Sequence, residues 1–139
     1  SNTVAYVNLD SVTAGDIEYV YSAESQADLR DWTLAWASAN GLDLQTIHDV
    51  DLDDEDGGTS DYYAFERDGI PYLYFEATNW TLGDEDGYTQ VDPGYGDHGS
   101  IWHTKYDTLA YLDATFPGRV DANLRLVTTV LYQILTEYE

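Results

Sequence analysis

SDYYAFERDGIPYLYFEA, residues 60–77, decides the fold because it joins a helix pattern to a strand pattern through a short turn. Ser60 or Asp61 can cap a short helix, and Gly69 follows where that helix must end. Residues 72–76 are then rich in the aromatic side chains that strands favour. The stretch predicts a helix-turn-strand unit, which is a building block of proteins that combine helices with a sheet.

Further elements of both kinds precede this unit. Residues 3–12 are rich in β-branched and aromatic residues, which predicts a strand buried on both faces. Leu29, Trp32 and Trp36 recur at helical spacing and predict an amphipathic helix. Residues 42–47 form a second, shorter strand pattern.

Two helices carry additional signals. Ser25 followed by Asp28 predicts a capping box at the start of the first helix, and Asn40-Gly41 predicts its end. The C-terminal helix is expected to have one apolar stripe, formed by Leu124, Val127, Leu131, Ile134 and Leu135. We therefore expect an α/β fold, a mixed sheet flanked by helices, in a single domain over residues 1–139.

The charge of the chain excludes one class of partner. Of the 139 residues, 27 are acidic and five are basic, which gives a formal net charge of -22. Nucleic acids and anionic membranes are recognised by clustered Lys and Arg, so we expect neither as a partner. Apolar residues make up 43% of the chain, which is enough for a folded core under an acidic surface.

Cysteine is absent, which excludes disulfides, thiolate catalysis and zinc sites built from cysteine. No apolar run is long enough to span a bilayer, and no signal-peptide pattern opens the chain. A strand pattern follows Ser1 and Asn2 almost at once, so we expect these two residues to be the remnant of a tag and the natural protein to extend upstream.

Two short segments carry the residues best suited to a metal. In VNLDSV, residues 7–12, Asp10 closes an apolar run, and in IWHTKYDTL, residues 101–109, His103 lies on a loop. A carboxylate at a strand end and a histidine can converge on one crevice of an α/β sheet as metal ligands. An Asp that closes a strand is otherwise a turn former. Asp107 either orients the imidazole of His103 or caps the helix that follows.

The glycine-rich residues 77–102 show no sustained periodicity of apolar side chains. Such a long irregular segment in a small domain indicates a functional loop. We expect Trp80 and Tyr88 to line the wall of a substrate cleft there. Asn79-Trp80-Thr81 also matches the glycosylation sequon by pattern. The acidic residues 49–56 do not follow the EF-hand order of calcium ligands and are interpreted as solvated surface.

Three segments in order resemble the dizinc (co-catalytic zinc) aminopeptidase family. They are NLD at residues 8–10, the helix-turn-strand unit at residues 60–77 and HTKYDTL at residues 103–109. Three more segments narrow the resemblance to the isozyme-conversion type of aminopeptidase within this family. They are YFEATNW at residues 74–80, GDEDGYTQ at residues 83–90 and FPGR at residues 116–119. The resemblance implies a three-layer αβα zinc-peptidase fold, of which the chain supplies only the C-terminal portion.

By this resemblance Asp10 would bind one zinc ion and His103 the other, and the pair of ions would activate a water for peptide hydrolysis. Asp61 would serve the scaffold beside the site, and Asp107 the second shell. The general-base glutamate and the other ligands of the family would lie upstream of residue 7. We therefore expect the fragment alone to be inactive.

The resemblance further implies a peptide or protein substrate and a secreted or cell-surface bacterial protein. A fragment of a larger domain is expected to associate with itself through its exposed face.

Two alternatives to the peptidase function stay open. One is a binding module for carbohydrate or protein that uses its 13 tyrosines and four tryptophans. The other is a metal-free pseudo-peptidase domain.

Overall fold

A mixed four-stranded sheet in the order β1-β4-β2-β3 forms the centre of the protein. In the computed structural model, residues 3–47, 60–82, 84–85, 88–89, 101 and 104–138 are described. The sheet strands are β1 (Tyr6–Leu9), β2 (Ile17–Tyr21), β3 (Leu44–Gln45) and β4 (Tyr72–Thr78). β1 and β4 are parallel, β2 is antiparallel to β4, and β3 is parallel to β2.

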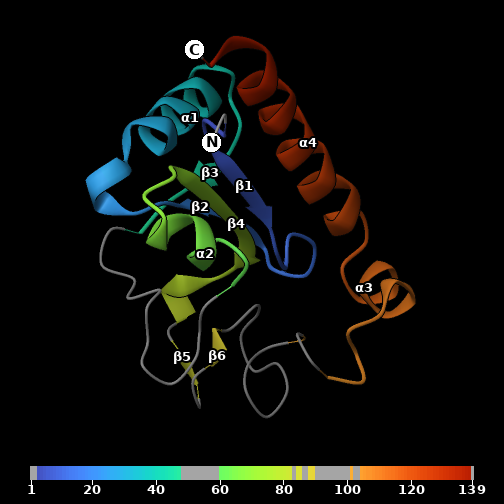
Figure 1. Ribbon diagram of the computed structural model, residues 1–139. Helices are drawn as coiled ribbons and strands as arrows, with labels where there is room; N and C mark the ends of the chain where they lie inside the picture. The colour runs from blue at the N-terminus through green and yellow to red at the C-terminus, as the bar shows by residue number, and fades with distance from the viewer. Residues whose placement is uncertain are drawn as a thin grey trace.

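Helices lie on both sides of this sheet (Figure 1). The α-helices are α1 (Asp28–Ala39), α2 (Tyr63–Arg67), α3 (Leu109–Thr115) and α4 (Arg119–Glu137). Two 3-10 turns, η1 (Glu24–Gln26) and η2 (Trp80–Leu82), and a small hairpin of β5 (Asp84–Glu85) and β6 (Tyr88–Thr89) complete the elements. The expected α/β class, a mixed sheet flanked by helices, is confirmed. Within the described residues no helix has both the length and the apolar character needed to cross a membrane.

The main core lies between the sheet and the helices α1 and α4. Strand residues Val20, Leu73 and Phe75 are fully buried, and they pack in one cluster with Leu29 of α1 and Val127 of α4. Each such side chain stabilises the fold by roughly 1.5–3 kcal/mol relative to an exposed position. This cluster fixes the position of β4, whose C-terminal end meets that of β1.

The opposite face of the sheet is lined by tyrosines. Five of them form a buried cluster: Tyr19, Tyr21, Tyr62, Tyr72 and Tyr74. Because side chains alternate along a strand, the same β2 and β4 that bury aliphatic side chains toward α1 and α4 direct these rings to the other side. Tyr62, which precedes α2, stacks on Tyr72 with ring centroids 4.6 Å apart. Polar rings therefore form much of this second core.

One carboxylic acid is buried on the face of the sheet that α1 and α4 cover. Glu18 of β2 is 2% exposed, and neither of its carboxylate oxygens has a hydrogen-bond partner among the described residues. Burial, and to a smaller extent the charge of Glu76, raises the pKa of Glu18 to about 9. The side chain is therefore protonated at neutral pH.

The turn between β1 and β2 is held against the end of β4. A Cβ at Gly15 would lie 2.2 Å from backbone atoms of Ala77 and Thr78. Asn123 of α4 donates its side-chain amide to the carbonyl of Gly15 at 3.0 Å, and Asn79 donates to Asp16 at 3.1 Å. Glycine at position 15 and two buried amides thus fix the turn that follows the β1 carboxyl end.

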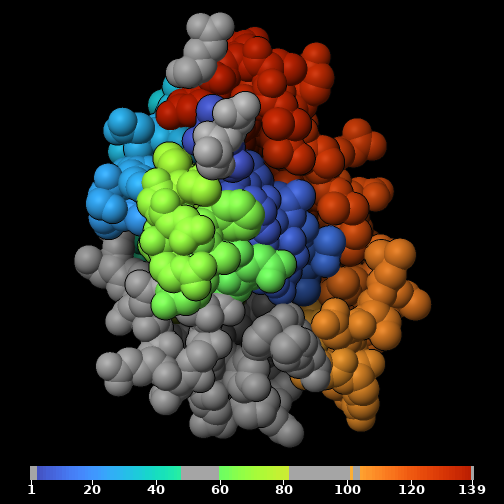
Figure 2. All heavy atoms as spheres, in the orientation of Figure 1, coloured from blue at the N-terminus to red at the C-terminus, as the bar shows by residue number. Residues whose placement is uncertain are grey.

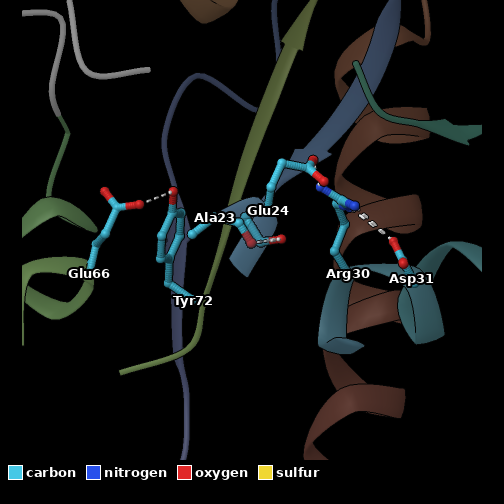
Figure 3. A network of polar contacts seen from close by, with 7 residues as sticks. Ala23, Glu24, Arg30, Asp31, Glu66 and Tyr72 are labelled. Atoms are coloured by element: carbon cyan, nitrogen blue, oxygen red, sulfur yellow. Dashed lines mark hydrogen bonds and ion pairs between the residues drawn. The ribbon is translucent and has the colours of Figure 1, made fainter. Parts of the chain in front are cut away.

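A polar network connects η1 with α1 (Figure 3). Arg30 is buried in α1, and its guanidinium pairs with Glu24 at 2.5 Å and with Asp31 at 3.0 Å. In the same view Tyr72 of β4 donates to Glu66 of α2 at 3.2 Å. The Arg30 ion pairs thus join η1 to α1, and the Tyr72 hydrogen bond joins β4 to α2.

Several sequence predictions require correction. The predicted capping box at Ser25 and Asp28 is wrong, because α1 begins after Ala27 without a side-chain cap. The strand expected at residues 3–12 is shorter, and β2 was not predicted at all. In α4 the predicted stripe is partly wrong, because Leu124 and Leu135 are exposed. The buried positions of α4 are Val120, Asn123, Val127, Val130, Gln133 and Ile134.

Candidate functional site

Asp10 lies at the carboxyl end of β1, where the predicted site begins. Its backbone N–H donates to the carbonyl of Phe75 at 3.2 Å, so the parallel pairing with β4 extends to this residue. The register sets Leu9 opposite Phe75 and Asn8 opposite Tyr74. Alternation along the strands therefore directs Asn8, Asp10 and Tyr74 to the tyrosine-lined face of the sheet. The Asp10 side chain is exposed.

Two hydroxyl groups hold the Asp10 carboxylate. Ser60 donates to Oδ2 at 2.6 Å, and Ser11 donates to Oδ1 at 3.2 Å. Asn8 in turn donates its amide to the Ser60 hydroxyl at 2.7 Å. Figure 2 shows the segment that contains Ser60 and α2, in green, directly against the blue segment that contains β1 and Asp10. The carboxylate is oriented by side chains from two distant parts of the chain.

Further polar groups lie beside Asp10 on β4. Tyr74 is 9% exposed, and burial together with the charges of Glu76 and Asp10 raises the pKa of its hydroxyl. Glu76 accepts a hydrogen bond from Tyr21 at 3.2 Å, and the indole N–H of Trp80 donates to the same Tyr21 hydroxyl at 2.5 Å. A neutral tyrosine and two carboxylates thus share the end of the sheet where β1 and β4 finish.

The structure describes only part of the predicted ligand set. His103, the second predicted metal ligand, lies outside the described residues, so its distance from Asp10 stays untested. Asp61 is exposed in the turn before α2. Asp107 is exposed as well, and the alternative that it caps the following helix is wrong. Thr108 is the N-cap of α3, and its side chain accepts a hydrogen bond from the backbone of Tyr111.

The two residues predicted to line a substrate cleft lie in neighbouring short elements. Trp80 begins η2, is half-buried and packs against the tyrosine cluster. Tyr88 belongs to β6, where it pairs with Glu85, and its side chain lies outside the described residues. The indole N–H of Trp80 therefore anchors this side chain to the tyrosine cluster through its hydrogen bond to Tyr21. The role of Trp80 toward a substrate stays a prediction.

Sequence reasoning missed the groups that surround Asp10. Ser60 was expected to cap α2, but the N-cap of α2 is Tyr62 without a side-chain hydrogen bond, and the Ser60 hydroxyl bonds Asp10 instead. Asn8, Tyr74 and Glu76 gave no signal by themselves. Their proximity follows from the register of β1 on β4, which a single sequence does not specify.

The chemistry of Asp10 fits one position of a metal site. It is an exposed carboxylate at a sheet end, and hydroxyl donors hold both of its oxygens, as is common for metal-ligating carboxylates. Among the described residues no group of three or more His, Asp or Glu side chains gathers to hold an ion. Among the described residues, Asp10 thus offers one oriented carboxylate that suits such a site.

Comparisons with known proteins identify the family of the chain. Residues 1–128 match peptidase family M28, and the chain belongs to this family. The alkaline phosphatase isozyme conversion protein of Escherichia coli (strain K12) is 31% identical over 146 residues, which cover 98% of this chain and 42% of that protein. The chain therefore spans less than half the length of this relative. No solved structure gives a significant match.

The matched family is one of peptidases, as the sequence resemblance implies. The resemblance to the aminopeptidases, drawn from residues 8–10, 60–77 and 103–109, is confirmed at the level of the family and of this relative. The mixed sheet with helices on both faces agrees with a partial domain of that family.

Proposed function

We propose that the chain is the C-terminal part of the catalytic domain of a zinc-dependent aminopeptidase, which removes N-terminal residues from peptides or proteins. The observation that carries the proposal is the Asp10 carboxylate, exposed at the carboxyl end of β1 and oriented by Ser60 and Ser11. Family membership and the relative from Escherichia coli support the class of reaction.

The proposed roles of the residues follow from their chemistry. Asp10 would hold one zinc ion, and His103, which the structure does not describe, would hold the other. When bound, zinc lowers the pKa of a water and polarises the peptide carbonyl. Ser60 and Ser11 keep the Asp10 carboxylate in one orientation. The buried Tyr74 hydroxyl stays protonated and is available as a hydrogen-bond donor at the same sheet end.

We propose that this chain alone has no useful aminopeptidase activity. A dizinc site needs more ligands than Asp10 and His103 supply, and it also needs a general base.

We propose in addition that Asp61 and Asp107 support the site from outside the ligand set and that Trp80 and Tyr88 line the substrate cleft. The complete enzyme is proposed to be secreted or bound at the cell surface, which fractionation of the source cells tests.

Replacing Asp10 in the complete enzyme tests the proposal. Asp10→Ala should lower the hydrolysis of aminoacyl anilides at least about a hundredfold, since metal ligation contributes several kcal/mol to the transition state. It should also lower the zinc content of the purified protein. The matched control is Asp28→Asn, an exposed acidic residue at the start of α1, which should change neither measurement.

The two alternative functions predict different outcomes. A metal-free pseudo-peptidase would contain no zinc as purified and would hydrolyse no anilide before or after the Asp10 substitution. A carbohydrate-binding module would need exposed aromatic faces, but the structure buries Tyr19, Tyr21, Tyr62 and Tyr72 almost completely. These four tyrosines, among the aromatic residues that motivated this alternative, are part of the core and offer no face to a sugar.

A further inference from the structure

Glu76 lies directly beside Asp10 at the end of the sheet. The parallel pairing of β1 and β4 sets Leu9 opposite Phe75, and the N–H of Asp10 still bonds the carbonyl of Phe75 at 3.2 Å. The next residues in register are therefore Asp10 and Glu76. Because neighbouring strands lie about 4.8 Å apart and side chains alternate between faces, both carboxylates project side by side from the tyrosine-lined face. Tyr19, which pairs with Glu76 from the other side, belongs to the tyrosine cluster of the same face.

A neutral group holds the Glu76 side chain in place. Tyr21 of β2 donates its hydroxyl to Oε2 of Glu76 at 3.2 Å, and the indole N–H of Trp80 donates to the same hydroxyl at 2.5 Å. A tyrosine hydroxyl orients a carboxylate but does not neutralise its charge. Glu76 therefore presents an oriented negative charge next to Asp10.

The hydroxyl of Tyr74 differs from those of its neighbours in the tyrosine cluster. The hydroxyl of Tyr21 donates to Glu76. The hydroxyl of Tyr72 donates to Glu66 at 3.2 Å. Tyr74 is only 9% exposed, and among the described residues its hydroxyl has no hydrogen-bond partner. A polar group that is this deeply buried is costly without a partner, so the Tyr74 hydroxyl suits a bound ligand.

The surroundings of this hydroxyl are negatively charged. Burial first, and then the charges of Glu76 and Asp10, raise the pKa of the Tyr74 hydroxyl, so the group stays neutral. The same two charges favour a positively charged group at this place. An ammonium group has three N–H donors, and carboxylate and hydroxyl oxygens accept hydrogen bonds from them. This end of the sheet thus suits a ligand that carries an ammonium group.

We propose that Glu76 and Tyr74 form a subsite beside Asp10 that binds the α-ammonium group of the N-terminal residue of the substrate. The proposal rests on the aminopeptidase function proposed above, in which Asp10 holds the metal. Glu76 supplies the charge, and the hydroxyl oxygen of Tyr74 accepts one of the N–H groups. Such a subsite confines hydrolysis to chain ends, because a peptide with a blocked N-terminus has no cation to place there.

Two inhibitors that differ only in the amino group test the subsite in the complete, zinc-loaded enzyme. Leucine hydroxamate carries the ammonium group, and 4-methylpentanohydroxamic acid is the same molecule without it. The ratio of their dissociation constants, measured by calorimetry at about pH 6.5, where an α-amino group is protonated, gives the contribution of the ammonium group. In the wild type we expect leucine hydroxamate to bind about a hundredfold more tightly.

Glu76→Gln should reduce this ratio at least about tenfold, the usual weight of a hydrogen bond with a charged group. Glutamine keeps an oxygen that accepts from Tyr21, so the substitution removes the charge but not the anchor. The matched control is Glu66→Gln. Glu66 also accepts from a tyrosine of the cluster, but from Tyr72 at the start of β4, and its substitution should leave the ratio unchanged.

The hydroxyl of Tyr74 is tested in the same way. Tyr74→Phe should reduce the ratio about threefold to tenfold, because the ammonium group loses one neutral acceptor. Tyr72→Phe removes a hydroxyl that bonds Glu66, and it should leave the ratio unchanged. An unchanged ratio in Tyr74→Phe would remove Tyr74 from the subsite.

Zinc content gives a readout independent of inhibitor binding. It should be the same in the wild type, Glu76→Gln and Tyr74→Phe, whereas Asp10→Ala should lose zinc. A loss of zinc in Glu76→Gln would assign this carboxylate to the metal and contradict the subsite.

The outcomes separate this proposal from the proposed function. If the wild type binds both inhibitors equally well, or if Glu76→Gln keeps the full preference, the subsite is wrong while the aminopeptidase proposal stands. An equal loss of affinity for both inhibitors has the same meaning, since it would show a structural carboxylate. A loss confined to lysine hydroxamate would assign Glu76 to the substrate side chain and overturn the subsite as well. A wild type that binds neither inhibitor and hydrolyses no aminoacyl anilide would overturn both proposals.

Discussion

Glu18 is a residue whose protonation at neutral pH depends on the fold. The folded state raises its pKa from 4.5 to about 9, through burial first and the charge of Glu76 second. Between these values the folded protein binds a proton that the unfolded chain releases. The free energy of unfolding that Glu18 contributes is therefore complete below its ordinary pKa and is lost as the pH rises toward 9.

Replacing Glu18 with Gln removes this dependence. Glu18→Gln should match the wild type in stability near pH 5 and exceed it increasingly toward pH 9, by at most about 1.4 kcal/mol for each pH unit. Urea unfolding at several pH values measures the difference. Glu137→Gln, an exposed carboxylate in the last turn of α4, should leave the wild-type pH slope unchanged. A wild type and a Glu18→Gln variant with parallel pH profiles would contradict the assignment.

Gly15 makes a second prediction for a single residue. Because its Cβ would lie 2.2 Å from the backbone of Ala77 and Thr78, Gly15→Ala must move β4 or the turn. We expect a loss of roughly 2–4 kcal/mol in the free energy of unfolding. Gly118→Ala is the comparison, because Gly118 has φ +82° with nothing within 4 Å of its Cβ position. Its cost should be only about 1–2 kcal/mol of backbone strain. Equal losses in both variants would exclude the steric explanation.

Among the elements, α3 depends visibly on its cap. This helix has seven residues, too few to be stable by itself, and Thr108 satisfies a backbone N–H of its first turn. Thr108→Ala should lower the free energy of unfolding by about 1 kcal/mol, and Thr108→Ser should retain most of it. Urea unfolding of the three proteins tests this. A loss of the same size in Thr108→Ser would mean that the methyl group matters rather than the hydroxyl.

The sequence predicted most elements but missed β2. The pattern for α1 was strong because Leu29, Trp32 and Trp36 recur at helical spacing and Asn40-Gly41 supplies a stop signal. β2 has the residues Ile17 to Tyr21, and the acidic Glu18 in second position interrupts an otherwise strand-like run. That carboxylate is compatible with burial only because it is protonated, which no local pattern shows.

Predictions of helix starts failed for a different reason. Ser25, Asp28 and Ser60 are all residue types that cap helices, but none of them caps one here. Their side chains compete between a local backbone partner and a partner that the tertiary structure brings close. For Ser60 that partner is Asp10, which lies 50 residues earlier in the sequence.

At the scale of the whole molecule, the large negative net charge affects the free energy of unfolding. A net charge of -22 on 139 residues repels itself across the folded surface. Raising the salt concentration from 0.1 to 2 M NaCl should therefore stabilise the protein by about 2 kcal/mol, or roughly 6–10 °C in Tm. KCl at the same ionic strength should act alike if screening is the cause. A Tm that does not rise with either salt would show that repulsion is unimportant.

The apolar surface makes a second prediction for the whole molecule. Tyr132 and Leu135 of α4 are 69% and 74% exposed, and Leu124 on the same helix is 41% exposed. We propose that these three exposed side chains, Leu124, Tyr132 and Leu135, contact a second copy of the chain when it is alone in solution. Sedimentation should show a dimer whose dissociation constant rises at least about tenfold in Leu135→Glu. Thr129→Glu, on the exposed surface of the same helix, is the control. A monomer at all concentrations would refute this.

The site was predicted less completely than the fold. Asp10 was identified from its place at the end of an apolar run, and the structure sets it at the carboxyl end of β1 as expected. Its partners were not identified, because they come together only through the pairing of β1 with β4 and through the packing of α2. Local patterns predict a ligand, whereas the groups that orient its side chain depend on tertiary contacts.

Asn79 has a consequence for how the protein can be produced. It stands in the sequon Asn79-Trp80-Thr81, but it is 7% exposed and its amide nitrogen is bonded to Asp16. A folded chain thus offers no acceptor to an oligosaccharide transferase. In a eukaryotic secretory host, however, a glycan is attached while the chain is still unfolded. Such a glycan would be attached to the nitrogen that donates to Asp16 in the turn before β2, so a bacterial host suits production of this protein better.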